Sequence, residues 1–275
     1  TMSTPGMATD PQNPYRSPVA TPLEFHYADD SPAYSAPSRR LRAGQGAAWI
    51  GSAWRLLMNA PLMWLAAMLL MLAISTVLNM IPVLGTLFGL LLAPSLAVGV
   101  LAFGQSHARR GSADIGQLFA GFQGDRVGAL MIMSLLFMAL MMLAVIALMG
   151  FLALALGGAG LMGSLSSEES LRAAVLGGSG LILMLGLLIF LLGMMVATAA
   201  YWFAPGLIYF AGLNPVDAMK ESLLACLYNW PAFLVYSLAA TGLLLLGTIP
   251  FGLGLLVVGP LLMASVYTSF EDLFG

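Results

Sequence analysis

Charged residues, histidine and cysteine are all scarce in this chain of 275 residues. Only 8% of the residues are charged, whereas roughly a quarter is usual in soluble domains. Hydrophobic residues make up 60% of the chain, and the mean hydropathy is +0.94. This composition excludes a soluble globular domain and indicates an all-α, polytopic membrane protein.

The few cysteines and histidines also limit the chemistry. The single cysteine, Cys226, has no intrachain disulfide partner, and two histidines, His26 and His107, are too few for a Cys/His metal cluster. Ten basic against twelve acidic residues give a net charge of −2, so no overall basic field attracts nucleic acid. We expect no metal site, no cofactor and no nucleic-acid partner.

The long apolar tracts carry no ionisable side chain. Charges at the centre of a bilayer are costly and mark proton relays or buried catalysis where they occur. The serines between residues 157 and 180 have no histidine nearby to act as a base. We therefore expect no catalytic residue and no enzymatic activity, while a neutral pore or a facilitator stays open.

Residues 1–43 differ from the rest of the chain because they are rich in Pro, Ser, Tyr and Asp and lack hydrophobic periodicity. We expect this cytoplasmic tail to be disordered alone and to contain no signal peptide. Aromatic residues spaced among prolines suit a segment that becomes ordered on a protein partner. A solvated tether is the alternative. The predicted partner-docking residues are Tyr15, Phe25, Tyr27 and Tyr34.

A basic cluster follows, formed by Arg39, Arg40 and Arg42. It directly precedes the first apolar region. Each basic residue near a membrane surface contributes about 1 kcal/mol of attraction to anionic lipids. These three arginines are therefore predicted to contact anionic headgroups.

The apolar region, residues 44–275, contains tracts long enough for six transmembrane helices of about 20 residues each. Helices of this length satisfy their own backbone hydrogen bonds in lipid. The predicted spans are Ala60–Met80, Val83–Gly104, Gly128–Ala155, Leu181–Tyr209, Ala232–Thr248 and Phe251–Phe270.

Self-similarity in the sequence predicts three parallel repeats, at about residues 44–111, 112–213 and 214–275. The first and last copies match best, with proline landmarks at near-constant offsets of 170, 168 and 166. We expect each repeat to hold a short amphipathic helix at the membrane interface, followed by a helical hairpin. The paired prolines are Pro61, Pro82 and Pro94 with Pro231, Pro250 and Pro260.

Two local patterns refine this outline. Asn214, Pro215 and Asp217 form a typical helix start, with a capping side chain, a first-turn proline and a first-turn carboxylate. Prolines inside three of the spans each remove a backbone donor. We predict helix kinks at Pro94, Pro205 and Pro260.

Motifs in the apolar region resemble a family of small bacterial inner-membrane proteins of unknown function. These motifs are Asn59-Ala60-Pro61, Phe203-Ala204-Pro205, the stretch from Leu223 to Trp230, and Pro260 and Tyr267 with Glu271-Asp272. The region is also distantly similar to the membrane domain that precedes some glycerophosphodiesterases. The resemblance implies the six-helix architecture and assigns no functional residue.

The function indicated by these features is that of a non-enzymatic accessory or scaffold protein of the bacterial inner membrane. The missing catalytic groups and the long tail favour this hypothesis, and we expect membrane lipids and a protein as partners. The alternative is a facilitator or a transporter of lipids or small molecules that works without intramembrane charges.

Basic residues predict the orientation. Nine of the ten precede the first span or lie between spans on the same side, and only Arg172 lies on the other side. The positive-inside rule places both termini in the cytoplasm. In a Cys226→Ala background, we expect a cysteine introduced at Ser166 to react with an impermeant thiol reagent in intact cells. Cys226 in the native chain should be protected, and the reverse pattern would overturn this orientation.

Overall fold

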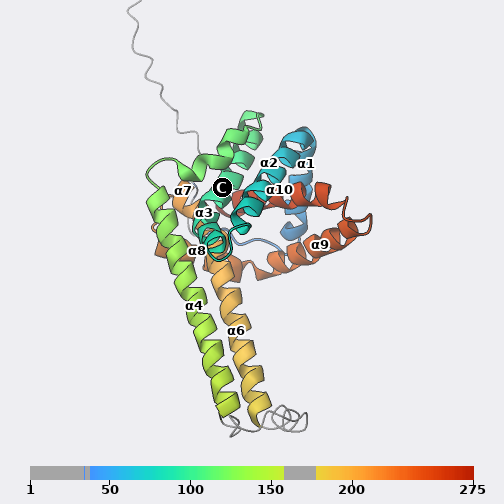
Figure 1. Ribbon diagram of the computed structural model, residues 1–275. Coiled ribbons are helices and arrows are strands. Elements are labelled where there is room, and N and C mark those ends of the chain that lie inside the picture. The colour runs from blue at the N-terminus through green and yellow to red at the C-terminus, as the bar shows by residue number, and fades with distance from the viewer. Residues whose placement is uncertain (1–33, 35–37, 158–177) are drawn as a thin grey trace, which may run out of the picture. The chain divides into compact units, whose positions relative to one another are not determined.

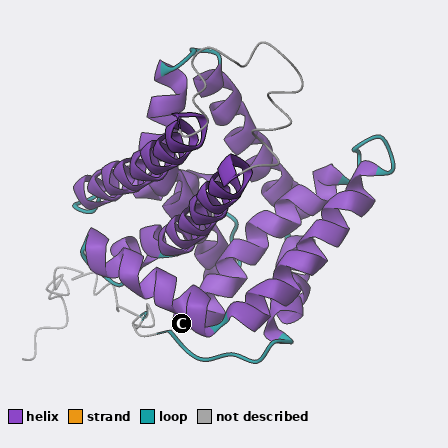
Figure 2. Cartoon of the chain, turned by 90° about the horizontal axis from the view of Figure 1, so that it is seen from below, coloured by secondary structure: helices purple, strands orange, loops and turns teal. Residues whose placement is uncertain are grey.

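The computed structural model describes Tyr34, residues 38–157 and residues 178–275 (Figure 1). Every regular element in these ranges is a helix, and loops or turns join the helices (Figure 2). The described residues belong to one compact unit that runs from Ala33 to Gly275. The predicted all-α class is therefore confirmed.

Six helices in the described ranges are long and apolar enough to cross a membrane, as predicted. Four agree with the predicted spans within a few residues at both ends, whereas the second span ends six residues later than predicted and the last span begins four residues later. The spans are α2 (Pro61–Asn79), α3 (Leu84–Arg110), α4 (Val127–Gly157), α6 (Gly178–Trp202) with α7 (Ala204–Phe210), α9 (Trp230–Thr248) and α10 (Leu255–Phe274). This is the architecture of a multi-pass membrane protein.

A short helix precedes each pair of long ones: α1 (Gln45–Asn59), η1 (Ile115–Phe122) and α8 (Pro215–Tyr228). The predicted start of α8 is confirmed, because Asn214 Oδ1 accepts a hydrogen bond from the Asp217 N–H at 3.0 Å. The order of one short and two long helices thus occurs three times in the described ranges. The internal repeat itself stays a prediction.

The second short helix is a 3₁₀-helix rather than a regular amphipathic α-helix. Asp114 caps it through a hydrogen bond of 2.9 Å from the Gly116 N–H to Oδ1. Two glycines allow the backbones of η1 and α3 to pack directly on each other. A Cβ at Gly99 of α3 would collide with the Leu118 carbonyl, and a Cβ at Gly121 of η1 would collide with the Ser95 carbonyl. The 3₁₀-helix η1 is thus in close backbone contact with α3.

Buried side chains gather at one end of the long helices. We call this end the base and define it as α1, η1, α7, α8 and the adjoining halves of the six spans. The start of α2 buries Trp64, the end of α3 buries Phe103, and the end of α10 buries Phe270. A buried hydrogen bond of 2.9 Å from Trp64 Nε1 to His107 Nδ1 links α2 to α3 there. The base is therefore the core of the protein.

Away from the base the hairpins separate. The α4–α6 hairpin and the α9–α10 hairpin extend in different directions from the base (Figure 1). Large apolar side chains are exposed along their length, such as Leu143 on α4, Leu188 on α6 and Leu245 on α9. In lipid, an exposed apolar surface of this kind is the stable arrangement.

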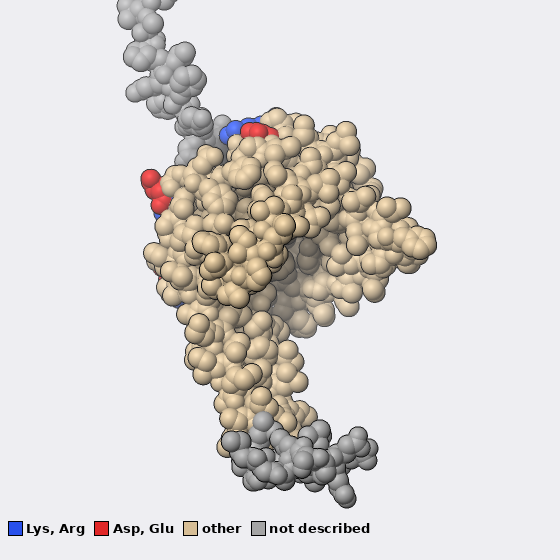
Figure 3. Space-filling model, in the orientation of Figure 1, with Lys and Arg blue, Asp and Glu red and all other residues tan. Residues whose placement is uncertain are grey.

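Charge follows the same division. In the space-filling view, the Lys, Arg, Asp and Glu atoms that are visible lie beside the base, and none is visible along the α4–α6 hairpin (Figure 3). Arg109 and Glu271, at the ends of α3 and α10, form an ion pair of 3.2 Å there. The base is thus the polar end of the molecule, and the hairpins form its apolar part.

The three spans predicted to be kinked differ from one another. Regular helix is interrupted near Pro205, because α6 ends at Trp202 and α7 begins at Ala204, whereas α3 continues past Pro94 and α10 past Pro260. In α3 and α6, a hydroxyl from another helix binds the backbone nearby, as when Ser134 Oγ of α4 donates to the Leu91 carbonyl of α3 at 2.9 Å. Such hydroxyls help satisfy backbone groups around a proline in lipid.

The last span begins at Leu255, four residues later than predicted. The turn before it contains Phe251 at φ 53° and Gly252 at φ 81°. This left-handed backbone is incompatible with a right-handed helix. Pro250 and the positive φ angles therefore delay the start of α10.

The contact between η1 and α3 gives a stability prediction. Replacing Gly99 with alanine should destabilise the fold by about 1–3 kcal/mol, because the added methyl group would overpack the interface. Gly89→Ala in the same helix is the control, since a Cβ there meets open space. We expect only Gly99→Ala to lower the thermal unfolding temperature in detergent. Equal unfolding temperatures for the two variants would contradict this packing.

Candidate functional site

The first candidate site is a polar cluster that holds the N-terminal part of the described chain on the base. We call Tyr34 and residues 38–43 the strap. The Tyr34 ring is 6% exposed and packs between Phe210 of α7 and Phe270 of α10, with ring centroids 5.1 Å and 5.0 Å away. The strap is thus part of the protein's own core.

The Tyr34 hydroxyl is the centre of a hydrogen-bond network. It donates to Glu271 Oε2 at 2.8 Å and accepts from Gln105 Nε2 at 3.1 Å and from Arg109 Nη2 at 3.3 Å. Burial, followed by the hydrogen bond to Glu271, raises the pKa of Tyr34 above its usual value. Tyr34 therefore stays protonated and acts as a donor to the carboxylate.

A second contact fixes the backbone of the strap. The Asn229 side chain, fully buried between α8 and α9, accepts from the Leu41 N–H at 2.7 Å and donates to the Arg39 carbonyl at 3.1 Å. An amide side chain can pair with an extended backbone in this way because it offers both a donor and an acceptor. The Arg39 N–H donates to the Leu273 carbonyl at 2.9 Å. The strap thus joins α8, α9 and α10.

A polar cleft lies beside the strap, with a volume of about 520 Å³. Asp272 stands at its edge and accepts hydrogen bonds from Trp49 Nε1 at 2.8 Å and Gln45 Nε2 at 3.4 Å. The residues that line it include the basic Arg39 and Arg109 and the acidic Glu271 and Asp272. Its lining is formed by Arg39, Gln45, Ala48, Trp49, Ser52, Ala108, Arg109, Tyr267, Thr268, Glu271, Asp272 and Gly275.

The second candidate site begins where α6 is interrupted. The Ser222 hydroxyl of α8 donates to the Ala199 carbonyl at 2.7 Å and accepts from the Phe203 N–H at 3.0 Å. In an uninterrupted α-helix these two backbone groups would bind each other, since they are four residues apart. Ser222 is therefore inserted into the backbone ladder of α6, one of the known causes of a helix bend.

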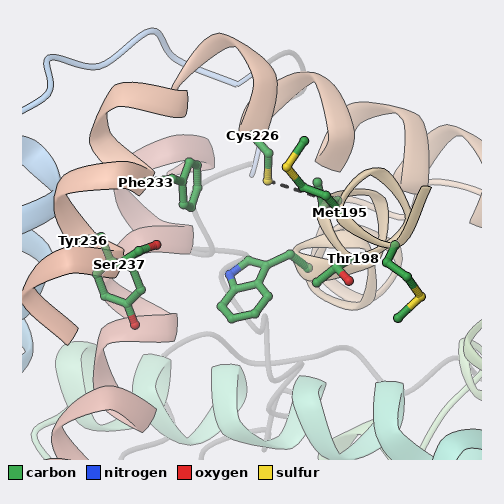
Figure 4. Close-up of a pocket in the computed structure, with 9 residues that line it drawn as sticks. Met195, Thr198, Cys226, Phe233, Tyr236 and Ser237 are labelled. Carbon is green, nitrogen blue, oxygen red and sulfur yellow. Dashed lines mark hydrogen bonds between the residues drawn. The ribbon is translucent and has the colours of Figure 1, made fainter. Parts of the chain in front are cut away.

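An apolar cleft of about 400 Å³ opens beside this insertion, between α6, α8 and α9 (Figure 4). Cys226 projects from α8, Phe233 from α9 and Met195 from α6 (Figure 4). Burial raises the pKa of Cys226 to about 12, so its thiol is neutral at physiological pH. The full lining is Met194, Met195, Thr198, Ala199, Trp202, Cys226, Phe233, Tyr236 and Ser237.

Of the four predicted partner-docking residues, the structure describes only Tyr34. The prediction is wrong for Tyr34 in this arrangement, because its ring and hydroxyl are engaged by α3, α7 and α10. Tyr15, Phe25 and Tyr27 lie outside the described residues. The predicted boundary between the tail and the apolar region, at residue 43, also differs from the structure. The strap packs on the base and belongs to the compact unit that begins at Ala33.

The three arginines predicted to contact lipid are exposed at the base. The Arg39 side chain lines the polar cleft, and the Arg40 guanidinium lies over the Tyr228 ring, 4.8 Å from its centroid. Arg42 is exposed next to the start of α1. Their contact with anionic headgroups stays a prediction.

Within the described ranges, no group of three or more His, Cys, Asp or Glu residues is placed to hold a metal ion. Glu168 and Glu169 lie outside these ranges. The described carboxylates of Glu271 and Asp272 are engaged by Tyr34, Arg109, Trp49 and Gln45.

Sequence reasoning missed the roles of Asn229, Asp272 and Ser222. The sequence does indicate that Asn229 needs a hydrogen-bond partner, because this polar residue lies between Tyr228 and Trp230 at the edge of an apolar span. That partner, the strap, lies 188 residues away from it in the chain. No local pattern predicts such a contact.

No protein family, curated protein or solved structure shows a significant match to this chain.

The strap gives a test of the base. Asn229→Ala should cost about 1–3 kcal/mol, because it leaves the Leu41 N–H and the Arg39 carbonyl without their partner. Asn79→Ala is the control, since Asn79 is exposed at a hairpin tip. We expect limited trypsin digestion to cleave after Arg39, Arg40 or Arg42 several-fold faster in Asn229→Ala only. Identical digestion of both variants would show that Asn229 does not hold the strap.

Proposed function

We propose that this chain is a non-enzymatic accessory or scaffold protein of the bacterial inner membrane, with both termini in the cytoplasm. The hairpins sit in the bilayer, and the base faces the cytoplasm. The excess of basic residues in the segments that join the base supports this orientation through the positive-inside rule.

The observation that carries the proposal is how the strap attaches to the base. A tail that served only as a solvated tether would need no fixed exit point. Instead, Tyr34 and Asn229 fix the strap through partly buried hydrogen bonds, and the 33 residues before Tyr34 are covalently connected at this polar end. In the proposed orientation, those residues are presented to cytoplasmic or membrane-bound proteins.

In this proposal the partner binds Tyr15, Phe25 and Tyr27, because Tyr34 belongs to the core. Aromatic side chains are enriched at the energetic centres of protein interfaces because they bury a large area with few rotatable bonds. The base holds the attachment point in place, and the tail engages the partner.

A second candidate function is a facilitator or a transporter of lipids or small molecules. The apolar cleft between α6, α8 and α9 favours it, because the cleft adjoins the interruption of α6 near Pro205. Interrupted helices line the substrate sites of many transporters. Stoichiometric copurification of a protein supports the first function, and a substrate-dependent thermal shift supports the second.

A triple variant tests the first proposal. In the full-length chain, replacing Tyr15, Phe25 and Tyr27 with alanine should remove a copurifying protein that is present in stoichiometric amounts with the wild type. The thermal unfolding temperature should not change, because the core residue Tyr34 is intact.

The matched control replaces three non-aromatic apolar residues of the same tail, Met7, Val19 and Leu23, with alanine. This control should retain the partner. The docking role of the tail is wrong if the aromatic variant keeps its partner in full, or if both variants lose the partner equally.

A further inference from the structure

The polar cleft beside the strap is assembled from segments that lie far apart in the sequence. Arg39 comes from the strap, Trp49 and Ser52 from α1, and Thr268 and Asp272 from α10. The helices α1 and α10 pack against each other at the base. The cleft volume of about 520 Å³ is within the roughly 300–1,000 Å³ of small-molecule sites. The base therefore offers room for a small polar ligand.

The α10 wall of the cleft presents acceptors. Thr268 and Asp272 are four residues apart, so they share one face of the helix. Trp49 Nε1 and Gln45 Nε2 both donate to Asp272 Oδ2, and Oδ1 accepts no hydrogen bond from the described residues. The Thr268 hydroxyl donates its proton to the Trp49 carbonyl at 2.9 Å. Asp272 Oδ1 and Thr268 Oγ1 are therefore acceptors that a ligand can use.

The charged side chains of the cleft form one ion pair and leave two charges apart. Arg109 and Glu271 balance each other in the ion pair of 3.2 Å. Arg39 and Asp272 also carry opposite charges, but neither forms an ion pair with a described residue. Asn229 and a carbonyl of α10 fix the backbone of Arg39 on both sides. A cation and an anion thus line the same cleft without pairing with each other.

A ligand that complements these groups carries both charges. A primary ammonium only donates hydrogen bonds, so it suits the Asp272 carboxylate and the Thr268 oxygen. The Arg39 guanidinium presents its donors in a fork that fits a phosphate through charge-assisted hydrogen bonds. The cleft is therefore suited to a zwitterion with a primary ammonium at one end and an anionic group at the other.

We propose that the polar cleft binds a phosphoethanolamine group, with its ammonium on Asp272 and Thr268 and its phosphate on Arg39. This inference goes beyond the docking role of the tail, because it gives the base a ligand of its own. The choice of a phosphate rests on the membrane placement in the proposed function. Two sources supply the group: the headgroup of phosphatidylethanolamine and soluble phosphoethanolamine.

Lipid retention tests the first source in the full-length protein. We would reconstitute it in nanodiscs of phosphatidylglycerol with equal fractions of phosphatidylethanolamine and phosphatidylcholine, and count the retained lipids by native mass spectrometry. Phosphatidylethanolamine should be retained roughly ten-fold over phosphatidylcholine, because a trimethylated ammonium cannot donate a hydrogen bond to Asp272.

Thermal unfolding in detergent tests the second source. A ligand that binds only the folded protein raises the unfolding temperature. A rise with phosphoethanolamine and none with phosphocholine at the same concentration shows that the soluble group is recognised. Selective retention in nanodiscs without this rise assigns the site to the lipid headgroup.

Charge-removing variants provide the decisive comparison. Asp272→Asn keeps an oxygen that can accept from Trp49 but removes the charge, so the preference for the ethanolamine compounds should be lost. Asp125→Asn is the matched control, because Asp125 is exposed and does not line the cleft. Each variant is compared with its own ligand-free unfolding temperature.

Arg39 tests the other end of the ligand and does not depend on the folding of the Asp272 variant. Arg39→Gln should weaken binding of the ethanolamine compound roughly ten-fold, as expected for the loss of hydrogen bonds between charged groups. Arg42→Gln is the control, since Arg42 is exposed on the strap and does not line the cleft.

Three outcomes would overturn the proposal: no preference for ethanolamine over choline in either assay, the same preference in Asp272→Asn as in Asp125→Asn, or unchanged binding in Arg39→Gln. None of them affects the tail-dependent partner. The triple tail variant should likewise bind phosphoethanolamine as the wild type does. The two proposals therefore fail separately.

Discussion

Both ends of the described chain meet in one partly buried polar contact, and the fold of the base depends on it. Tyr34 reaches Glu271 and Arg109, while Asn229 holds the backbone of the strap. A buried polar network is stable only when each member finds its partner. The hairpins separate beyond the base. This network therefore joins the strap, α3, α10 and the junction of α8 and α9 at the place where these elements contact one another.

The same constraint explains the serines of the base. In lipid, a backbone group that loses its helical partner has no water to bind, so a side chain must replace that partner. Ser222 does this for α6 by bridging the Ala199 carbonyl and the Phe203 N–H, and Ser134 contributes a hydrogen bond to the Leu91 carbonyl of α3. The α6 helix is thereby interrupted without an unsatisfied group at these positions, and the apolar cleft forms beside it.

These features assign different roles to the two parts of the molecule. The base fixes the strap and collects the charged side chains, whereas the hairpins expose apolar surface suited to lipid. The proposed partner binds the tail before Tyr34. In the proposed orientation, one chain can therefore place a cytoplasmic docking segment at a fixed point of the membrane surface.

The sequence by itself determined the six spans, because long apolar runs must become helices in lipid, and it determined the start of α8, because Asn214 and Pro215 act on their immediate neighbours. It did not predict that Tyr34 is a core residue, and it predicted an α-helix where η1 is 3₁₀. Those features, like the Asn229 contact and the apolar cleft, depend on groups far apart in the chain. Hydropathy and capping are local properties that a sequence displays directly, whereas the pairing of buried polar groups is decided only when the helices pack.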